Sequence, residues 1–156
     1  MADNSSITIR RARREDVGAI VRMLADDALG ASRERLEEPL PSCYFQAFEK
    51  VARDQNLKLV VAEEGGVVVG CLQLCILPGL SSQGASRGLI EDVRVASDRR
   101  SRGIGEQLVQ WAVKEARGRG CRLVELLTHN IAASMPSGFY ERLGLCAQPC
   151  RDDIAV

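Results

Sequence analysis

A short segment in the middle of the chain combines positive charge with two glycines and reads Arg100-Ser101-Arg102-Gly103-Ile104-Gly105. It follows an apolar strand pattern and opens an amphipathic helix pattern. Glycine lets the backbone approach a ligand with no Cβ in the way, and the free amides of a first helical turn bind anions. Because Arg99 adds a further cation beside this turn, the segment predicts a site for a phosphate-bearing cofactor.

Two common phosphate motifs fit this segment poorly. A Walker A loop requires Gly-x-x-x-x-Gly-Lys-Ser/Thr, and that string is absent from the sequence. A dinucleotide-binding fold is favoured by Gly103, Gly105 and an acidic residue in the next strand, Glu125. Against it, Leu108 stands where the third glycine belongs, and the approach from the strand is long rather than tight.

The elements that must position this segment form a strand, a helix and a strand. Hydrophobic periodicity predicts a strand over 89–95, a helix over 103–118 and a strand over 121–127, which together form a right-handed parallel crossover. Two β-rich runs, 59–62 and 67–74, flank a Gly-Gly turn and predict an antiparallel hairpin. The other expected elements are a strand over 7–10, helices over 16–28 and 42–52, a loop over 78–86, a short helix over 134–143, and one or two closing strands within 145–156. The order β-α-α-β-β-β-α-β-α-β predicts a mixed sheet with helices on its faces.

Composition limits the classes of protein. A chain of 156 residues with 46% apolar residues is expected to form one domain over 1–156. Lys plus Arg and Asp plus Glu both number 21, so the net charge gives no support for a nucleic-acid partner. No apolar run approaches the roughly 20 residues that span a bilayer, and the first residues lack a signal-peptide pattern, so no membrane partner and a cytoplasmic location are expected.

The six cysteines are interpreted as buried, reduced thiols. They contain no Cys-x-x-Cys pair, and His129 is the only histidine, so no metal site is expected. Five of them lie within or beside apolar strand or helix patterns, where a thiol packs as a small hydrophobic group.

The segment with two glycines also resembles the Arg/Gln-x-x-Gly-x-Gly/Ala signature of the GNAT superfamily of acyl-CoA N-acyltransferases. The preceding run, Leu89-Ile90-Glu91-Asp92-Val93-Arg94-Val95, is similar to the strand before that signature. The run Phe139-Tyr140-Glu141-Arg142-Leu143-Gly144-Leu145 resembles the superfamily's Phe-Tyr-x-x-x-Gly-Phe element, and Ile9-Arg10-Arg11-Ala12 with Asp16 resembles its opening. Together these motifs cover most of the chain in the order of the superfamily.

The resemblance implies a fold and a cofactor. The fold is α+β, with a mixed, mostly antiparallel sheet of six to seven strands, splayed parallel central strands and about four flanking helices. The cofactor is acetyl-CoA, whose pyrophosphate lies on the turn that ends at Gly105 and whose pantetheine arm runs between the strands over 89–95 and 121–127. The residues implied in cofactor binding are Val93, Arg94, Val95, Arg100, Ser101, Arg102, Gly103, Ile104, Gly105, Glu106 and Asn130.

The resemblance also implies catalytic residues. Glu91 lies near the expected thioester and can take a proton from the amine, directly or through water, although a strand carboxylate paired with an arginine is a competing interpretation. Tyr140 matches the tyrosine that protonates the leaving thiolate in many members, and packing on the cofactor arm is its alternative role. Because side chains alternate along a strand, Asp92 is expected on the opposite face from Glu91.

The leading hypothesis is therefore an N-acetyltransferase that moves an acetyl group from acetyl-CoA to a primary amine by direct attack in a ternary complex, with backbone amides polarising the thioester. The acceptor, a small-molecule or peptide amine, is expected near 29–44 and 76–86. Glu34, Glu37 and Glu38 in the first of these segments can attract a cation, although a solvated acidic face is the favoured interpretation. Relatives are often dimers, which allows a homodimer here. The alternative is a non-catalytic acyl-CoA-binding or regulatory module, and a DNA-binding regulator has little support from the sequence.

Overall fold

The computed structural model describes residues 6–127, and the fold is of the mixed α+β type. Five strands form one sheet in the order β1-β2-β3-β4-β5: β1 (Thr8–Arg11), β2 (Leu57–Glu64), β3 (Val67–Leu77), β4 (Arg87–Val95) and β5 (Leu123–Leu126). The first four strands pair antiparallel, whereas β4 and β5 pair parallel. The expected mostly antiparallel sheet with a parallel pair is confirmed. The described residues hold five of the six to seven strands that were predicted.

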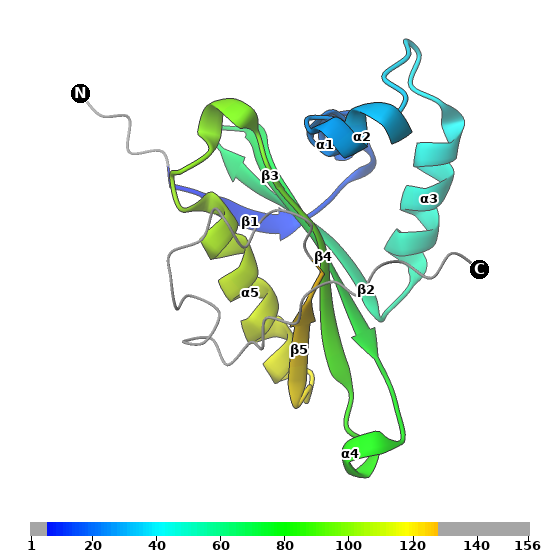
Figure 1. The fold of residues 1–156 in the computed structure, drawn as a ribbon, viewed down its shortest axis with the longest axis vertical. Coiled ribbons are helices and arrows are strands. Elements are labelled where there is room, and N and C mark those ends of the chain that lie inside the picture. The colour runs from blue at the N-terminus through cyan, green and yellow to red at the C-terminus, as the bar shows by residue number, and fades with distance from the viewer. Residues whose placement is uncertain (1–5, 128–156) are drawn as a thin grey trace.

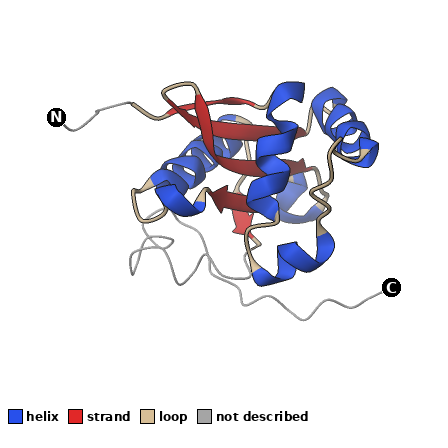
Figure 2. Cartoon of the chain, turned by 90° about the horizontal axis from the view of Figure 1, so that it is seen from above, coloured by secondary structure: helices blue, strands red, loops and turns tan. Residues whose placement is uncertain are grey.

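Helices cover the two faces of the sheet (Figures 1 and 2). One face carries α5 (Ile104–Gly118), and the other carries α1 (Val17–Leu24), α2 (Ala28–Arg33) and α3 (Ser42–Arg53). The helix predicted over 16–28 is shorter and interrupted. A 3-10 turn (Arg14–Asp16) leads into α1, which ends at Leu24, and α2 begins at Ala28. The separate α2 begins where the Asp27 carboxylate accepts a hydrogen bond from the amide of Gly30 (2.6 Å). The loop predicted over 78–86 contains a single turn, α4 (Ser81–Gly84).

The main hydrophobic core lies between α5 and the sheet. The apolar stripe of α5 includes the fully buried Leu108 and Ala112, and it packs on alternate residues of β3 such as Leu72 and Leu74. A second, smaller cluster lies under α1 on the opposite face, where Ile20 and Met23 pack against Val61 and Cys71. These two cores fix β3 and β4 in the middle of the molecule.

The opening motif is held by an ion-pair network. Arg10 donates to both carboxylate oxygens of Asp16 (2.7 and 3.1 Å) and to Glu63 on β2 (2.7 Å). Burial raises the pKa of Asp16, but the bonds from Arg10 and from the backbone of Arg13 outweigh it, so the pKa lies below its ordinary value. The network joins β1 to the start of α1, which gives a structural reason for the spacing from Arg10 to Asp16.

Three cysteines within the described residues, Cys71, Cys75 and Cys121, are buried, as expected from their apolar surroundings, and Cys43 is exposed. Burial raises the pKa of Cys71 to about 12 and that of Cys75 to about 11. Between residues 6 and 127, no helix combines the length and the apolar character needed to cross a membrane.

Candidate active site

The middle of β4 contains a β-bulge. Cys71 on β3 lies opposite Arg94, but two residues further along β3, Gln73 lies opposite Glu91 three residues back on β4. The extra residue is accommodated at Asp92, whose φ is 50°. A positive φ is uncommon for a residue with a side chain, and Asp tolerates it better than most residues.

The bulge changes which side chains share a face of the sheet. Ile90 and Val93 both pack under α5, although Val93 is three positions after Ile90 and regular alternation would put the two on opposite faces. The Asp92 carboxylate is close enough to Cys71 and Cys75 to raise the pKa of both thiols, after burial, and Cys71 belongs to the core under α1. Asp92 therefore lies on the same side as Glu91. The prediction that the two carboxylates face opposite sides was wrong because it assumed regular alternation.

Glu91 is held by neighbours on β3. Its Oε2 lies 3.3 Å from Gln73 Nε2 and 3.4 Å from Cys75 Sγ, and both groups can donate to it. No arginine or lysine pairs with Glu91 within the described residues, so the competing interpretation of a strand salt bridge finds no partner there. The carboxylate is half-buried, oriented and not committed to a cation.

Beyond the bulge, β4 leaves its parallel neighbour. The described β4–β5 ladder ends with Ile90 opposite Leu126, whereas β4 continues to Val95. The amide of Ala96 donates to Val69 on β3 (2.9 Å), so strand alternation directs the backbone N–H of Val95 to the other edge. The structure describes the chain only as far as Leu127, and within that part this edge of β4 has no strand partner after Ile90.

The turn after β4 presents an open backbone. Gly103 caps α5 with a φ of 75°, and Ser101 two residues earlier also has a positive φ of 62°. A Cβ built on Gly103 would meet no atom within 4 Å, so the backbone there is uncovered. The first amides of α5 lack intrahelical acceptors, and they begin at this open position. The residues present fit a phosphate group, because the only groups needed are backbone donors beside a position without a side chain.

The arginines of this turn are paired with carboxylates. Glu64, at the end of β2, accepts from Arg99 (2.9 Å) and from both terminal nitrogens of Arg102 (3.0 and 3.2 Å). Arg100 donates to Asp26, just after α1, at 2.8 Å. The sequence places three arginines around the turn, and in the structure each is paired with an acidic side chain, with Glu64 shared between Arg99 and Arg102.

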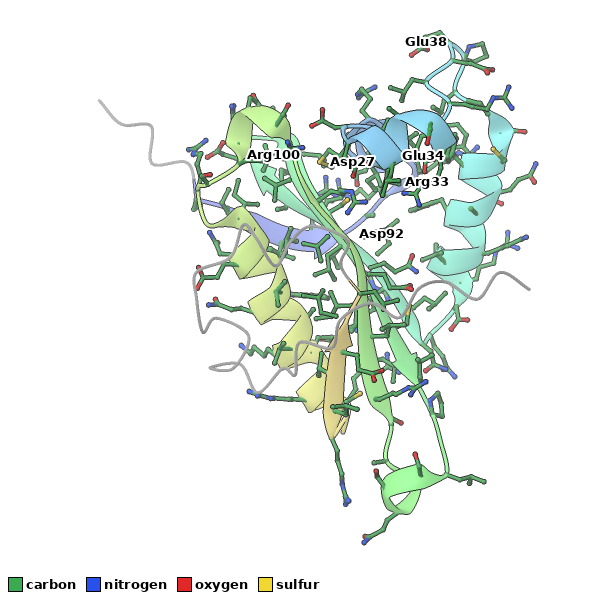
Figure 3. All side chains as sticks on the ribbon, viewed as in Figure 1. Asp27, Arg33, Glu34, Glu38, Asp92 and Arg100 are labelled. Atoms are coloured by element: carbon green, nitrogen blue, oxygen red, sulfur yellow. The ribbon has the colours of Figure 1, made fainter. Side chains whose placement is uncertain are left out.

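Two ion pairs link the end of β4 and the turn after it to the connection between α1 and α2. Asp26 and Asp27 lie between α1 and α2, and they pair with Arg100 (2.8 Å) and Arg94 (3.5 Å) respectively. Figure 3 shows Arg100 and Asp27 at the same end of the molecule, with Asp92 below them between the sheet and the helices. Arg94 Nε is buried without an acceptor among the described residues. The side chain of Arg94 is therefore directed to the α1–α2 connection and away from the α5 turn.

The two segments expected to line the acceptor side lie apart. Residues 29–44 include α2 and the start of α3 and sit at the end of the sheet that carries the α5 turn (Figure 1). Residues 76–86 include α4 and lie at the opposite end, where a cavity of about 260 Å³ is bordered by the β3–β4 loop and Arg122. Figure 3 shows Glu34, in the first segment, on the same side of the sheet as Asp92.

Two of the three acidic residues within 29–44 have a side-chain partner. Glu34 accepts from the Tyr44 hydroxyl (2.9 Å), and Glu37 pairs with Arg35 (2.7 Å). Glu38 is exposed and forms no ion pair with the other described residues.

The other predicted site residues divide by their surroundings. Val93 on β4 and Ile104, the first residue of α5, are both buried in the core between α5 and the sheet, so only their backbone groups can face a ligand. Glu106, in the first turn of α5, accepts from Gln110 (3.3 Å). Asn130 and Tyr140 lie outside the described residues.

Comparison with known proteins agrees with this fold and turn. The chain matches the Acetyltransferase (GNAT) family over residues 20–145. The chain belongs to this family, and the resemblance of its motifs is confirmed. Membership supports acyl-CoA-dependent acetyl transfer as the general activity.

Three individual proteins are similar to this chain in sequence or structure. The chain is 32% identical over 90 residues to the glucosamine 6-phosphate N-acetyltransferase of Trypanosoma brucei brucei, an alignment that spans 58% of either protein. It also resembles the crystal structure of a transcriptional regulator from Bacillus halodurans C-125, with 43% identity, a TM-score of 0.87, and coverage of 97% of this chain and 100% of that one. A putative acetyltransferase from Agrobacterium tumefaciens str. C58 is 27% identical, with a TM-score of 0.78 and coverage of 96% and 99%.

Proposed function

We propose that this chain is an N-acetyltransferase that uses acetyl-CoA and a primary amine. The observation that carries the proposal is the course of β4, which continues past the end of the described β4–β5 ladder to the open turn at Gly103. A free strand edge that leads from an anion site to a carboxylate suits an extended, phosphate-bearing substrate.

The cofactor is proposed to bind mainly through backbone groups. The amides of the turn from Arg100 to Gly105 and of the first turn of α5, which includes Glu106, would hold the pyrophosphate. The free edge of β4 at Val93 and Val95 would pair with the pantetheine arm, with Asn130 as a further hydrogen-bonding residue. Bound there, acetyl-CoA supplies an acetyl group that is activated toward amines.

Glu91 is proposed as the general base. An amine attacks only when it carries a lone pair, so a proton must leave it, directly or through water. Glu91 is suited to accept this proton because Gln73 and Cys75 orient its carboxylate and no described cation competes for it. Asp92, on the same side of the sheet, adds a second negative charge that favours approach of an ammonium group. Tyr140 is proposed to protonate the leaving thiolate.

The amine is proposed to enter from the side of α1, α2 and the start of α3. This part of the chain adjoins the α5 turn through the pairs of Asp26 and Asp27 with arginines. The relative from Trypanosoma brucei brucei supports a small-molecule amine, and glucosamine 6-phosphate is the first acceptor to assay.

The direct test is incubation with acetyl-CoA and a panel of small amines and peptides. Acetylated product should be followed by mass spectrometry, because the exposed Cys43 would itself react with a thiol reagent. Product above the level of the no-enzyme reaction, lost in Glu91→Gln, is the expected result. No product with any acceptor would contradict the proposal.

A non-catalytic acyl-CoA-binding regulator is the second candidate. It is favoured by the 43% identical protein from Bacillus halodurans C-125, which is described as a transcriptional regulator. This candidate predicts saturable CoA binding without transfer, and a thermal shift with CoA that Tyr140→Phe leaves unchanged.

A further inference from the structure

We infer that Glu64 is a positioning residue for the cofactor turn and that it acts through Arg99 and Arg102. This inference rests on the proposed function, because it concerns how the turn is held ready for the phosphates of CoA. Glu64 lies on β2, about 35 residues before the turn in sequence, and no phosphate motif includes it.

The contacts of Glu64 hold Arg99, just before the turn, and Arg102, in its middle. One carboxylate oxygen, Oε2, accepts from Arg99 Nε and from Arg102 Nη1, and Oε1 accepts from Arg102 Nη2. Between these arginines lies Ser101, which has a left-handed backbone, and Gly103 follows with the same sign of φ. A non-glycine residue keeps such a conformation only where its surroundings hold it. Glu64 supplies that restraint.

Burial makes this restraint effective. The Glu64 side chain is 12% exposed, whereas the side chains of Arg99 and Arg102 are 34% and 48% exposed. A carboxylate that is largely removed from water, and that accepts three charge-assisted hydrogen bonds, holds its partners more firmly than a surface pair does. The position of Glu64 is fixed in turn by the antiparallel ladder with β3.

The position of Glu64 beside the arginines distinguishes two ways in which the turn could bind the cofactor: through the charge of the arginines or through the placement of its backbone amides. If the arginines alone attracted the cofactor, a carboxylate beside them would weaken binding, because it cancels one of their charges. If the turn binds through correctly placed amides, the same carboxylate strengthens binding, because it fixes the backbone. The open backbone at Gly103 and the pairing of all three arginines with acidic side chains favour the second account.

The experiment measures CoA binding by calorimetry, which requires no acetyl transfer, for the wild type and three variants. Glu64→Gln removes the charge, Glu64→Asp keeps the charge but withdraws the carboxylate by one methylene, and Asp98→Asn is the matched control. Asp98 also accepts from Arg99 (2.7 Å), but its side chain is 70% exposed and it contacts only one of the two arginines.

Positioning predicts that Glu64→Gln and Glu64→Asp both weaken CoA binding about tenfold, the effect of losing one hydrogen bond to a charged group. Asp98→Asn should bind as the wild type does. In steady-state kinetics the KM for acetyl-CoA should rise in both Glu64 variants, with kcat and the acceptor KM unchanged. A general loss of structure would instead lower kcat and the unfolding temperature together.

Tighter binding by Glu64→Gln, with wild-type binding by Glu64→Asp, would show that Glu64 only masks charge and would overturn the inference. Unchanged binding in both variants would overturn it as well. A wild-type chain that does not bind CoA would overturn the proposed function and this inference with it.

Discussion

Substitution of Gly103 by alanine tests whether the turn before α5 binds the phosphates of the cofactor. Gly103 has a φ of 75°, and a Cβ added there meets no protein atom within 4 Å. The new methyl group therefore strains the backbone without a clash inside the protein. Gly120, two residues after α5, offers a matched control, because its φ is 78° and a Cβ there also meets nothing within 4 Å.

The two alanine variants should lose similar stability. A left-handed backbone costs an L-residue about 1–2 kcal/mol, and for a domain of this size each kcal/mol lowers Tm by about 2–4 °C. Their effects on the cofactor should differ. A phosphate oxygen that bonds to the backbone sits about 3 Å away from it, so a methyl group on Gly103 would displace it. Losing one such bond to a charged group, worth about 1.5–3 kcal/mol, weakens binding about tenfold to one hundredfold.

The assay is CoA titration by calorimetry together with thermal unfolding of both variants. Gly103→Ala should bind CoA at least about tenfold more weakly than Gly120→Ala at a similar Tm. Equal affinities in the two variants would refute the assignment of the turn as the phosphate site. A much lower Tm for Gly103→Ala alone would mean that the turn is needed for folding and would refute the assumption of equal strain.

Further predictions concern catalysis and stability. Glu91→Gln should lower kcat by a factor of about 10² to 10⁴ with the KM for acetyl-CoA unchanged, as steady-state kinetics can check. Tyr140→Phe should also lower kcat without weakening CoA binding, and equal turnover by this variant and the wild type would remove the proposed acid. Asp92→Gly should keep or raise Tm, because glycine relieves the positive φ, while the acceptor KM rises; an unchanged acceptor KM would mean that the carboxylate does not face the amine. Asp16→Asn should lower the free energy of unfolding in urea at pH 7 by about 1.5–3 kcal/mol, because Arg10 loses its charge-assisted bonds to Asp16 and keeps only those to Glu63. The folded-state pKa of Asp16 is depressed, so its contribution is present above the unfolded pKa and is lost as pH falls through the folded value; the wild type should lose this advantage over Asp16→Asn in acid.

The elements around the cofactor turn were predictable because each has a strong local pattern. The stripe of α5, the Gly-Gly hairpin and the apolar run of β4 all follow from spacing, and the structure confirms them. The separation of α1 from α2 was missed because it depends on a side-chain cap at Asp27 within a sequence that is helical by periodicity.

The less predictable features depend on contacts between distant parts of the chain. The bulge at Asp92 is a property of the β3–β4 register, and the sequence of β4 alone gives only an alternating strand. The pairing of Arg99 and Arg102 with Glu64 joins residues about 35 apart. A weak signal for this pairing was available, because an acidic residue immediately before a two-residue hairpin turn must lie at a sheet end.

The bulge and the paired arginines of the turn together give β4 two regions of different electrostatic character, although the chain has equal numbers of acidic and basic residues. At the α5 turn, carboxylates of Glu64 and Asp26 occupy the arginines, so an anion is left with the directed N–H groups of the backbone. On the face of β4 that carries α1, the bulge places the carboxylates of Glu91 and Asp92 on the same side, both close enough to raise the pKa of Cys75, and the proposed cationic amine would meet two negative charges there. The first surface would favour an anion and the second a cation, and both adjoin β4. Recognition therefore depends on where backbone and side-chain groups point, which is why substitutions that preserve charge but move a group, such as Glu64→Asp and Gly103→Ala, are more informative here than substitutions that change the net charge.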